Sequence, residues 1–232
     1  MQAVILAGGL GTRLRPMTER TPKPMVEVSG RPFLEYIVRH LASQDFRDLL
    51  ILTGYLGHHV ENHFGDGSTF GVSIRYAREH QPLGTGGAIR AAIDRIGESF
   101  LLLYGDSFLP IDYLEVVDAF ERAECRGLMV VYSNQTGDTG VSNNVDTDTS
   151  GRVKRYQKGT EDINLRYVEA GVLCFRRDVF AHLPANSVCS MESEIFPRLI
   201  SEQQLSSFAT SQRFFDIGTP TRLAEFMELQ QC

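Results

Sequence analysis

The sequence predicts an α/β protein with a Rossmann-like, mixed but mostly parallel sheet flanked by helices. Two observations predict this fold class. Short apolar segments rich in Val, Ile and Leu alternate with segments of helical periodicity over the first half of the chain, and such alternation is typical of parallel sheets that helices cover on both faces. The length of 232 residues, with no internal repeat or linker in the sequence, favours one domain over residues 1–232.

The first half of the chain repeats a strand–helix unit. Residues 2–7 form a β-rich apolar run that stops at Gly8 and Gly9, as a buried parallel strand does. Apolar residues then recur at helical spacing between 33 and 42. The elements expected in this half are strands over 2–7, 49–53, 72–77 and 100–104 and helices over 33–42, 60–64 and 87–96.

The alternation of strands and helices stops after residue 132, where three short strands follow one another with turns between them. We expect this region to supply the antiparallel pieces of a mixed sheet and the acceptor side of a site. The elements expected in this half are helices over 113–123, 191–200 and 221–230 and strands over 127–132, 145–148, 153–157, 168–175 and 214–217.

The charge balance argues against a nucleic-acid partner, because the chain has no excess of positive charge. Lys and Arg number 23 against 29 Asp and Glu, which gives a formal charge of −6. The longest apolar run near the start, residues 3–7, is far too short to span a bilayer. We therefore expect a cytoplasmic protein without a nucleic-acid or membrane partner, and association into a homo-oligomer stays open. The four scattered cysteines contain no Cys-x-x-Cys pair and are expected to be thiols.

A glycine-rich segment after the first strand predicts a phosphate site. Ligands of open parallel sheets bind beyond the carboxyl ends of the strands, and here Gly8, Gly9 and Gly11 let backbone N–H groups approach a ligand closely. Arg13 adds a fixed charge with a planar fork of donors. The segment lacks the Gly-Lys-Ser/Thr of a P-loop, and Leu14 stands where the dinucleotide fingerprint needs Gly. A P-loop kinase and a Rossmann dehydrogenase are therefore excluded.

Taken together, these residues and those after them resemble the signature of the sugar-1-phosphate nucleotidylyltransferases. The similarity covers essentially all 232 residues and implies a nucleotidyltransferase fold of the GT-A-like type. It is carried by Leu6–Pro16, Thr21–Met25, Pro82–Ala88, Gly105–Asp106 and Phe215–Pro220. The Leu-Gly-Thr-Gly-Gly-Ala-Ile form of the second glycine loop and the segment Ser190–Pro197 most resemble the heptose- and mannose-1-phosphate guanylyltransferase branch.

The resemblance implies that a nucleoside triphosphate reacts with a sugar 1-phosphate to give a nucleoside diphosphate sugar and pyrophosphate. The nucleophile is already a phosphate anion, so positioning and charge neutralisation replace a catalytic base. The implied catalytic residues are Arg13, Lys23 and Asp106, and the implied ligands of Mg²⁺ are Asp106 and Asp216. Taken alone, each aspartate is equally consistent with a turn cap beside its glycine.

The resemblance also implies the binding residues. The nucleotide would contact Leu6, Ala7, Gly8, Gly9, Gly11, Thr12, Arg13, Lys23, Gly84, Thr85 and Gly86. The acceptor would contact Lys158 through its phosphate, and Glu169, Gly171 and either Asn143 or Asn144 through its sugar. Gln157 stands where the family has Glu, so the sugar contact of that Glu is not carried over.

The sequence therefore predicts a Mg²⁺-dependent enzyme of glycoconjugate synthesis, with GTP and mannose or D-glycero-D-manno-heptose 1-phosphate as the first assignment. A uridylyl- or cytidylyltransferase for another sugar phosphate or phosphocholine stays open, because backbone groups read part of the base. A catalytically silent, nucleotide-sugar-binding regulatory subunit on the same fold is the third alternative. The presence of Arg13, Lys23, Asp106 and Asp216 argues against it, since a sensor needs no charges that serve turnover.

Overall fold

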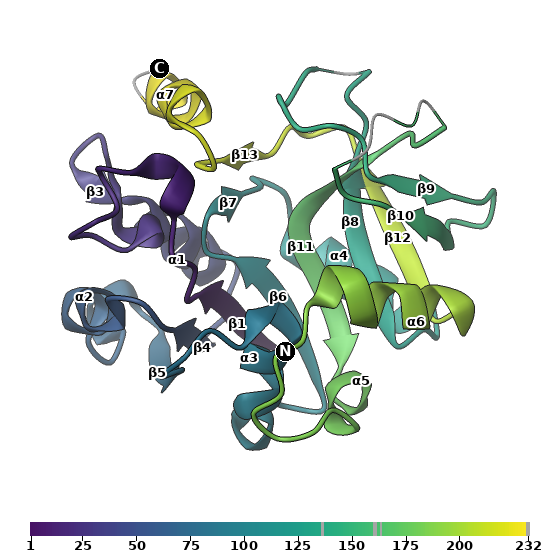
Figure 1. Cartoon of the computed structure of the whole chain (residues 1–232), viewed down its shortest axis with the longest axis horizontal. Helices are drawn as coiled ribbons and strands as arrows, with labels where there is room; N and C mark the ends of the chain where they lie inside the picture. The colour runs from purple at the N-terminus through teal and green to yellow at the C-terminus, as the bar shows by residue number, and fades with distance from the viewer. Residues whose placement is uncertain (136, 160–161, 163, 231–232) are drawn as a thin grey trace.

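The structure of the chain is a computed structural model, and it describes residues 1–135, 137–159, 162 and 164–230. Its main sheet contains β1 (Gln2–Ala7), β4 (Asp48–Thr53), β5 (Ser73–Arg78), β6 (Ser99–Tyr104), β8 (Gly127–Tyr132), β11 (Val168–Arg176) and β12 (Leu205–Thr210). The strand order is β12-β8-β11-β6-β1-β4-β5, and the sheet runs through the centre of the molecule (Figure 1).

The sheet is mixed and mostly parallel, as predicted. Only β11 runs antiparallel to its neighbours, β6 and β8, whereas the other neighbouring strands pair in parallel. The register pairs Leu6 with Tyr104 and Ala7 with Thr53. The carboxyl ends of β1, β4 and β6 therefore meet at one edge, where the sequence predicts the phosphate site.

Helices cover both faces of the sheet. They are α1 (Phe33–Ser43), α2 (Gly57–Phe64), α3 (Gly84–Ala91), α4 (Tyr113–Arg122), α5 (Asp178–Ala181), α6 (Phe196–Ser201) and α7 (Pro220–Leu229). Alternate residues of each strand point to opposite faces, and the buried side chains accordingly form two clusters. One cluster includes α1, α2, α4 and α7, and the other includes α3, α5 and α6.

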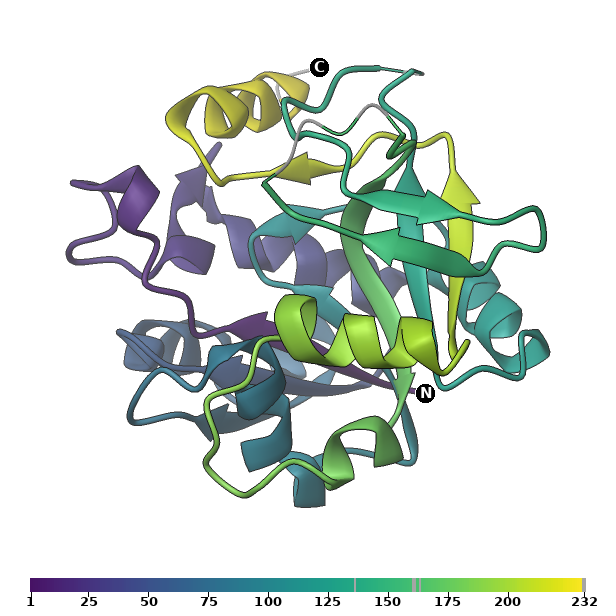
Figure 2. The same ribbon diagram turned by 45° about the vertical axis from the view of Figure 1, so that its right-hand side comes forward.

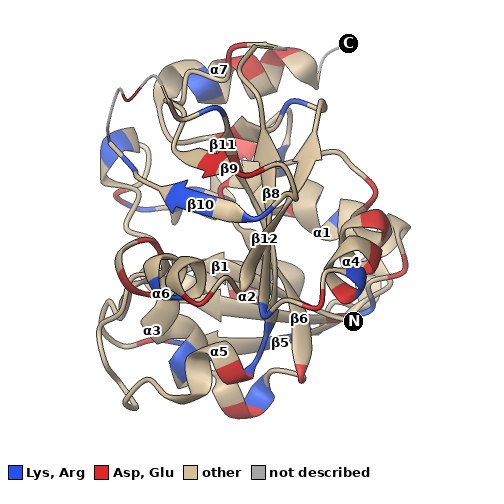
Figure 3. Cartoon of the chain, turned by 90° about the vertical axis from the view of Figure 1, so that its right-hand side faces the viewer, with Lys and Arg blue, Asp and Glu red and all other residues tan. Residues whose placement is uncertain are grey.

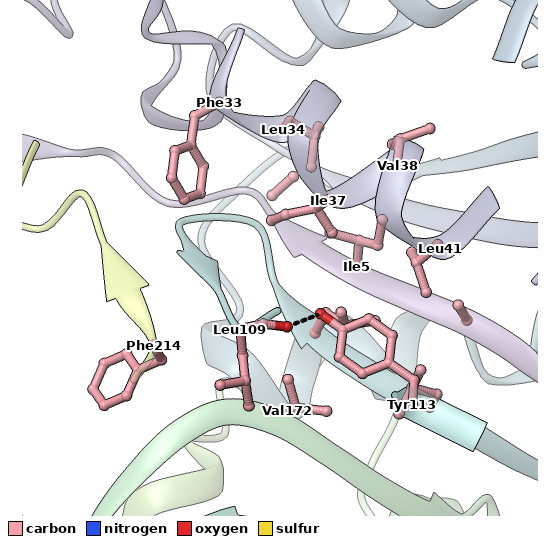
Figure 4. Packing of buried hydrophobic residues seen from close by; sticks show 14 of the residues in the cluster. Ile5, Phe33, Leu34, Ile37, Val38, Leu41, Leu109, Tyr113, Val172 and Phe214 are labelled. Carbon is pink, nitrogen blue, oxygen red and sulfur yellow. Dashed lines mark hydrogen bonds between the residues drawn. The ribbon is translucent and has the colours of Figure 1, made fainter. Parts of the chain in front are cut away.

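The helix α1 shows how the apolar pattern builds the first cluster. Its buried residues recur every three or four positions and face the sheet, where they pack beside Ile5 of β1 (Figure 4). On the same face, the hydroxyl of Tyr113 donates to the carbonyl oxygen of Leu109 at 2.9 Å. The periodicity over 33–42 therefore identified both the helix and its buried side.

Three small antiparallel pairs complete the fold: β2 (Glu27–Val28) with β3 (Arg31–Pro32), β7 (Ser107–Phe108) with β13 (Phe215–Asp216), and β9 (Val145–Thr147) with β10 (Val153–Tyr156). We expected three strands after residue 132 to join the main sheet, but only β11 does. The pair β9–β10 forms a separate ribbon beside α6 (Figure 2), because β12, which the sequence pattern missed, occupies the free edge of β8.

Two helix predictions were wrong in detail. The helix expected from residue 87 begins at Gly84, because contacts with residue 189 hold a glycine-rich turn that has little helical propensity of its own. The helix expected over 191–200 is a π-helical turn, Met191–Ile195, followed by α6. Pro197 lies in the first turn of α6, where its missing N–H leaves no helical hydrogen bond unmade.

Charge is spread over the fold. Figure 3 shows acidic and basic residues interspersed along the elements of the side that it presents, rather than gathered in one block. Within the described ranges, no helix combines the length and apolar character needed to cross a membrane.

Candidate active site

A cavity of about 470 Å³ opens where β1, β4, β5 and β6 end. This is the edge at which ligands of open parallel sheets bind. The predicted site residues that line it are Leu6, Ala7, Gly8, Gly9, Lys23, Gly84, Thr85, Asp106 and Lys158. Residues of both glycine loops therefore line one cavity. Lys23, which lies between two prolines, and Lys158, which is predicted to bind the acceptor, line the same cavity.

The other predicted site residues are not part of this lining: Gly11, Thr12, Arg13, Gly86, Asn143, Glu169, Gly171 and Asp216. Gly11 lies against Lys23, since a Cβ at position 11 would come 2.9 Å from the Cβ of Lys23. Its carbonyl oxygen accepts a hydrogen bond from Oγ1 of Thr18 at 2.7 Å. The glycine loop and Lys23 therefore pack as one unit, with Arg13 exposed on the turn that follows.

Lys23 and Asp106 form an ion pair at the cavity. Lys23 begins a 3-10 turn between two prolines, which fix the backbone on both sides, and its side chain is only 10% exposed. Asp106 follows β6, and its side chain is 37% exposed. A positive charge is thus held at the wall of the cavity, where an anionic ligand can reach it.

The pairing of β7 with β13 brings Asp216 close to Asp106. Asp216 faces Ser107 across this pair, and the N–H of Ile217 donates to the carbonyl oxygen of Asp106 at 3.0 Å. The Asp216 carboxylate accepts hydrogen bonds from Nη1 of Arg222 at 2.8 Å and from the N–H of Gly218 at 2.6 Å. Burial raises the pKa of Asp216, and the charge of Arg222 opposes that rise.

The two carboxylates fit a divalent ion only in part. Their oxygen donors are those that Mg²⁺ prefers, and the two groups lie close enough for Asp106 to help raise the pKa of Asp216. Both oxygens of Asp216 already accept hydrogen bonds, whereas Oδ1 of Asp106 accepts none within the described residues. In that part of the chain no group of three or more metal-binding side chains occurs. Substrate phosphates and water would have to complete the coordination.

Glu169, which the sequence predicts to contact the acceptor sugar, is a buried carboxyl group. Its Oε1 accepts a hydrogen bond from the N–H of Gly171 at 2.9 Å, and burial raises its pKa to about 7. Oδ1 of Asn144 accepts a hydrogen bond from the backbone N–H of Glu169 at 2.9 Å. Asn143 instead donates to the carbonyl oxygen of Leu165 at 2.9 Å and accepts from Asn134. Of the two asparagines, Asn144 is therefore the one that contacts Glu169.

Lys158 forms an ion pair with Glu192, and both residues line the cavity. Glu192 belongs to the π-helical turn before α6, and its side chain is 28% exposed against 62% for Lys158. Sequence reasoning missed Glu192 as a site residue. The segment Ser190–Pro197 carried a resemblance, but nothing in the sequence placed it opposite Lys158.

Glu79 is a second residue that sequence reasoning missed. It follows β5 and lines the cavity. Its Oε2 accepts a hydrogen bond from the backbone N–H of Leu83 at 3.1 Å. Its Oε1 lies against the backbone at Gly8, since a Cβ there would come within 2.8 Å of it. Burial raises the pKa of this carboxyl group. An acidic residue at the carboxyl end of a parallel strand, just before a glycine loop, was the available signal.

Hydrogen bonds join the second glycine loop to the segment that carries Glu192. The N–H groups of Gly86 and Gly87 donate to the carbonyl oxygen of Cys189 at 2.9 and 3.1 Å. In return, the N–H of Cys189 donates to Leu83 at 2.9 Å, and that of Met191 donates to Oγ1 of Thr85 at 2.9 Å. These hydrogen bonds therefore hold the second glycine loop and the segment of Cys189 and Met191 together beside the cavity.

Comparison with known proteins identifies the family of the chain. The family model described as nucleotidyl transferase matches residues 2–231. The chain is 33% identical over 223 residues to the mannose-1-phosphate guanylyltransferase of Mycobacterium tuberculosis, covering 95% of this chain but only 62% of that enzyme.

Two further proteins match over almost their whole length. The D-glycero-alpha-D-manno-heptose 1-phosphate guanylyltransferase of Campylobacter jejuni is 29% identical over 227 residues, which cover 98% of this chain and 99% of that enzyme. The crystal structure of HddC from Yersinia pseudotuberculosis superposes with a TM-score of 0.84 at 25% identity and covers 99% of both chains. The family model, which matches nearly the whole chain, shows that the chain belongs to the nucleotidyl transferase family.

Proposed function

We propose that the chain transfers a guanylyl group from GTP to mannose 1-phosphate or D-glycero-D-manno-heptose 1-phosphate and releases pyrophosphate. The names of the mycobacterial and Campylobacter relatives support the choice of nucleotide and acceptor. The observation that carries the choice of base is Glu79, whose carboxylate lines the cavity with one oxygen that accepts no hydrogen bond within the described residues.

A carboxylate favours guanine over the other bases. The Watson–Crick edge of guanine presents two neighbouring N–H donors, which a carboxylate can accept together, and hydrogen bonds to a charged acceptor are the strong ones. Uracil presents one N–H between two carbonyl oxygens, and these oxygens repel a carboxylate. Cytosine and adenine offer an amino group beside an acceptor nitrogen. With Oε2 already accepting the N–H of Leu83, the remaining oxygen of Glu79 favours an N–H donor of guanine over the carbonyl oxygens of uracil.

The chain's own residues neutralise and position phosphates. An oxygen of the acceptor phosphate attacks the α-phosphorus, and the bond from that phosphorus to the bridging oxygen breaks as pyrophosphate leaves. In this proposal Lys23 and Arg13 offset charge on the triphosphate, and Asp106 holds the ammonium of Lys23 at the cavity wall. Lys158 binds the acceptor phosphate in place of Glu192. No residue needs to act as a general base.

Asp106 and Asp216 are the residues that would hold Mg²⁺. Arg222 and the N–H of Gly218 fix the carboxylate of Asp216 for this role. When bound there, the ion would supply positive charge against the phosphates.

Pyrophosphate release, measured over a panel of nucleoside triphosphates and sugar 1-phosphates, tests the proposed function. We expect the wild type to release pyrophosphate faster from GTP than from UTP. In Glu79→Gln the ratio of these two rates should fall roughly 10- to 100-fold, the scale of one hydrogen bond to a charged group. UTP should gain relative to GTP, because the new amide can donate to a carbonyl of uracil. Glu98→Gln, a change at an exposed glutamate, is the control.

Three results would contradict the proposal in different ways. A wild type that prefers UTP or CTP rejects the guanylyl assignment. A Glu79→Gln variant with an unchanged GTP preference rejects the role of Glu79. Absence of turnover with every pair of substrates, in a protein that still binds a nucleotide sugar, favours the silent regulatory subunit.

A further inference from the structure

Two of the eight tyrosines bury a hydroxyl group that has no hydrogen-bond partner within the described residues. Five donate to backbone carbonyl oxygens at 2.7–3.0 Å: Tyr36, Tyr55, Tyr76, Tyr113 and Tyr132. The hydroxyls of Tyr104 and Tyr156 are buried and have no hydrogen-bond partner within the described part of the chain. Buried hydroxyls normally find a partner, so this pair requires an explanation.

Both unpartnered tyrosines lie on the acceptor side of the site. Tyr104 ends β6 and lines the cavity together with Lys158 and Glu192. Tyr156 ends β10, and its ring packs edge-on against Phe196 with the ring centroids 4.8 Å apart. Both rings pack on the face of the sheet that α3 and α6 cover.

The same acidic groups act on both phenols. After burial, the negative charges of Glu169 and Glu192 help raise the pKa of Tyr104 and of Tyr156. Glu169 and Glu192 therefore act on both hydroxyls, and Tyr104 shares the lining of the cavity with the ion pair of Lys158 and Glu192.

Packing does not account for these hydroxyls. Phenylalanine would supply the same ring at either position without a polar group to bury, and an unsatisfied buried hydroxyl destabilises the folded state. A ligand that offers hydrogen-bonding groups would satisfy them. A sugar hydroxyl fits well, because both it and a phenol can donate and accept.

We propose that Tyr104 is a specificity-determining residue whose hydroxyl binds a ring hydroxyl of the acceptor, with Tyr156 as the positioning residue behind it. This inference rests on the proposed function, since it assigns the sugar end of the acceptor whose phosphate Lys158 binds. A phosphate at Lys158 would compete with Glu192 for the ammonium, in the cavity that Tyr104 also lines. An acceptor without hydroxyl groups, such as phosphocholine, would leave them unsatisfied.

Tyr→Phe variants test the proposal with GTP and mannose 1-phosphate as substrates. We expect Tyr104→Phe to raise the KM for mannose 1-phosphate ~10-fold, the scale of one hydrogen bond, with the KM for GTP unchanged and the thermal midpoint not lowered. Tyr156→Phe should raise the same KM by a smaller factor without lowering kcat. The control is Tyr113→Phe, which loses a satisfied hydrogen bond to Leu109 and should lower the midpoint without changing either KM.

Monodeoxy analogues of mannose 1-phosphate identify the contact. The analogue that lacks the recognised hydroxyl should react poorly with the wild type and no worse with Tyr104→Phe, because the interaction is already absent. An unchanged KM for mannose 1-phosphate in Tyr104→Phe overturns the proposal. Equal losses for Tyr104→Phe with every analogue overturn it as well.

Direct titration of mannose 1-phosphate without GTP separates this inference from the proposed function. If the wild type shows no turnover but Tyr104→Phe binds mannose 1-phosphate more weakly, the contact stands and the activity fails. If both proteins bind it equally, or neither binds it, the contact is rejected whatever the activity.

Discussion

No described residue neutralises the guanidinium of Arg13, which lies exposed on the turn after the first glycine loop. If it offsets charge that develops at the α-phosphate, Arg13→Ala should lower kcat by ~100-fold or more, the scale of one transition-state contact. Arg20→Ala, an exposed arginine farther along the same loop, is the matched control. Single-turnover rates measure the effect, and near-normal rates in a folded Arg13→Ala protein would refute the role.

The charge of Lys158 should matter to one substrate only. Lys158→Ala should raise the KM for the sugar 1-phosphate and leave the KM for GTP unchanged, because the variant removes a charge for the acceptor and leaves Glu192 to repel its phosphate. Adding Glu192→Gln should recover part of the loss. Steady-state kinetics with each substrate varied in turn decide this, with Lys154→Ala as the control. Equal losses for both substrates would show a structural role.

At this scale the sequence located several residues of the cavity lining through its glycines and prolines, and the roles assigned to them stay predictions. Lys23 between two prolines and Asp106 after a buried strand do line the cavity, as expected. Glu79 was missed although it follows a strand and precedes a glycine loop, whereas Tyr104 at the end of β6 and Glu192 in the π-helical turn have no local signature. Their importance comes from what the topology places beside them.

The contact of α3 with residues 187–189 depends on glycine. A Cβ at Gly87 would collide with the carbonyl oxygen of Ser187. We expect Gly87→Ala to lower the free energy of unfolding by about 1–3 kcal/mol, the usual cost of overpacking, and to raise the KM for GTP. Gly97→Ala, whose Cβ would meet its nearest atom at 3.5 Å, is the control. Urea unfolding measures both variants, and equal stability would contradict the close approach.

Elements with strong periodicity were predicted well, and elements held by tertiary contacts were not. The boundaries of β1 and β8 match the expected ranges, because each is a continuous apolar run. The edge strand β12 has the sequence Leu-Ser-Ser-Phe-Ala-Thr, and because half of these residues are polar, no apolar run predicts the strand. The early start of α3 likewise depends on Cys189, which lies about a hundred residues away in the sequence.

The stability of the whole molecule should depend on pH through Glu169. Its pKa rises from 4.5 to about 7 on folding, because burial disfavours the charged form, and Glu192 and Asp106 add to the rise while Lys158 opposes it. The folded state therefore holds its proton more tightly, and this group's contribution to stability falls as the pH rises from about 4.5 to 7.

Glu169→Gln isolates this contribution from other titrating groups. The glutamine keeps the shape but carries no titrating proton, so its stability relative to the wild type should increase by roughly 2–3 kcal/mol between about pH 4.5 and pH 8. Urea unfolding of both proteins across that range is the measurement. Two parallel stability curves would show that Glu169 titrates normally in the folded protein.

The hydrogen bonds between the second glycine loop and residues 189–191 have a thermodynamic consequence. If a nucleotide orders Gly84 to Gly87, these hydrogen bonds would also order the segment carrying Glu192, and part of the conformational entropy needed to bind the acceptor would be lost before the acceptor arrives. Such linkage is reciprocal, and each substrate must then tighten the binding of the other by the same factor. Through the Thr85–Met191 hydrogen bond, we therefore expect the binding of the two substrates to be cooperative within a single chain.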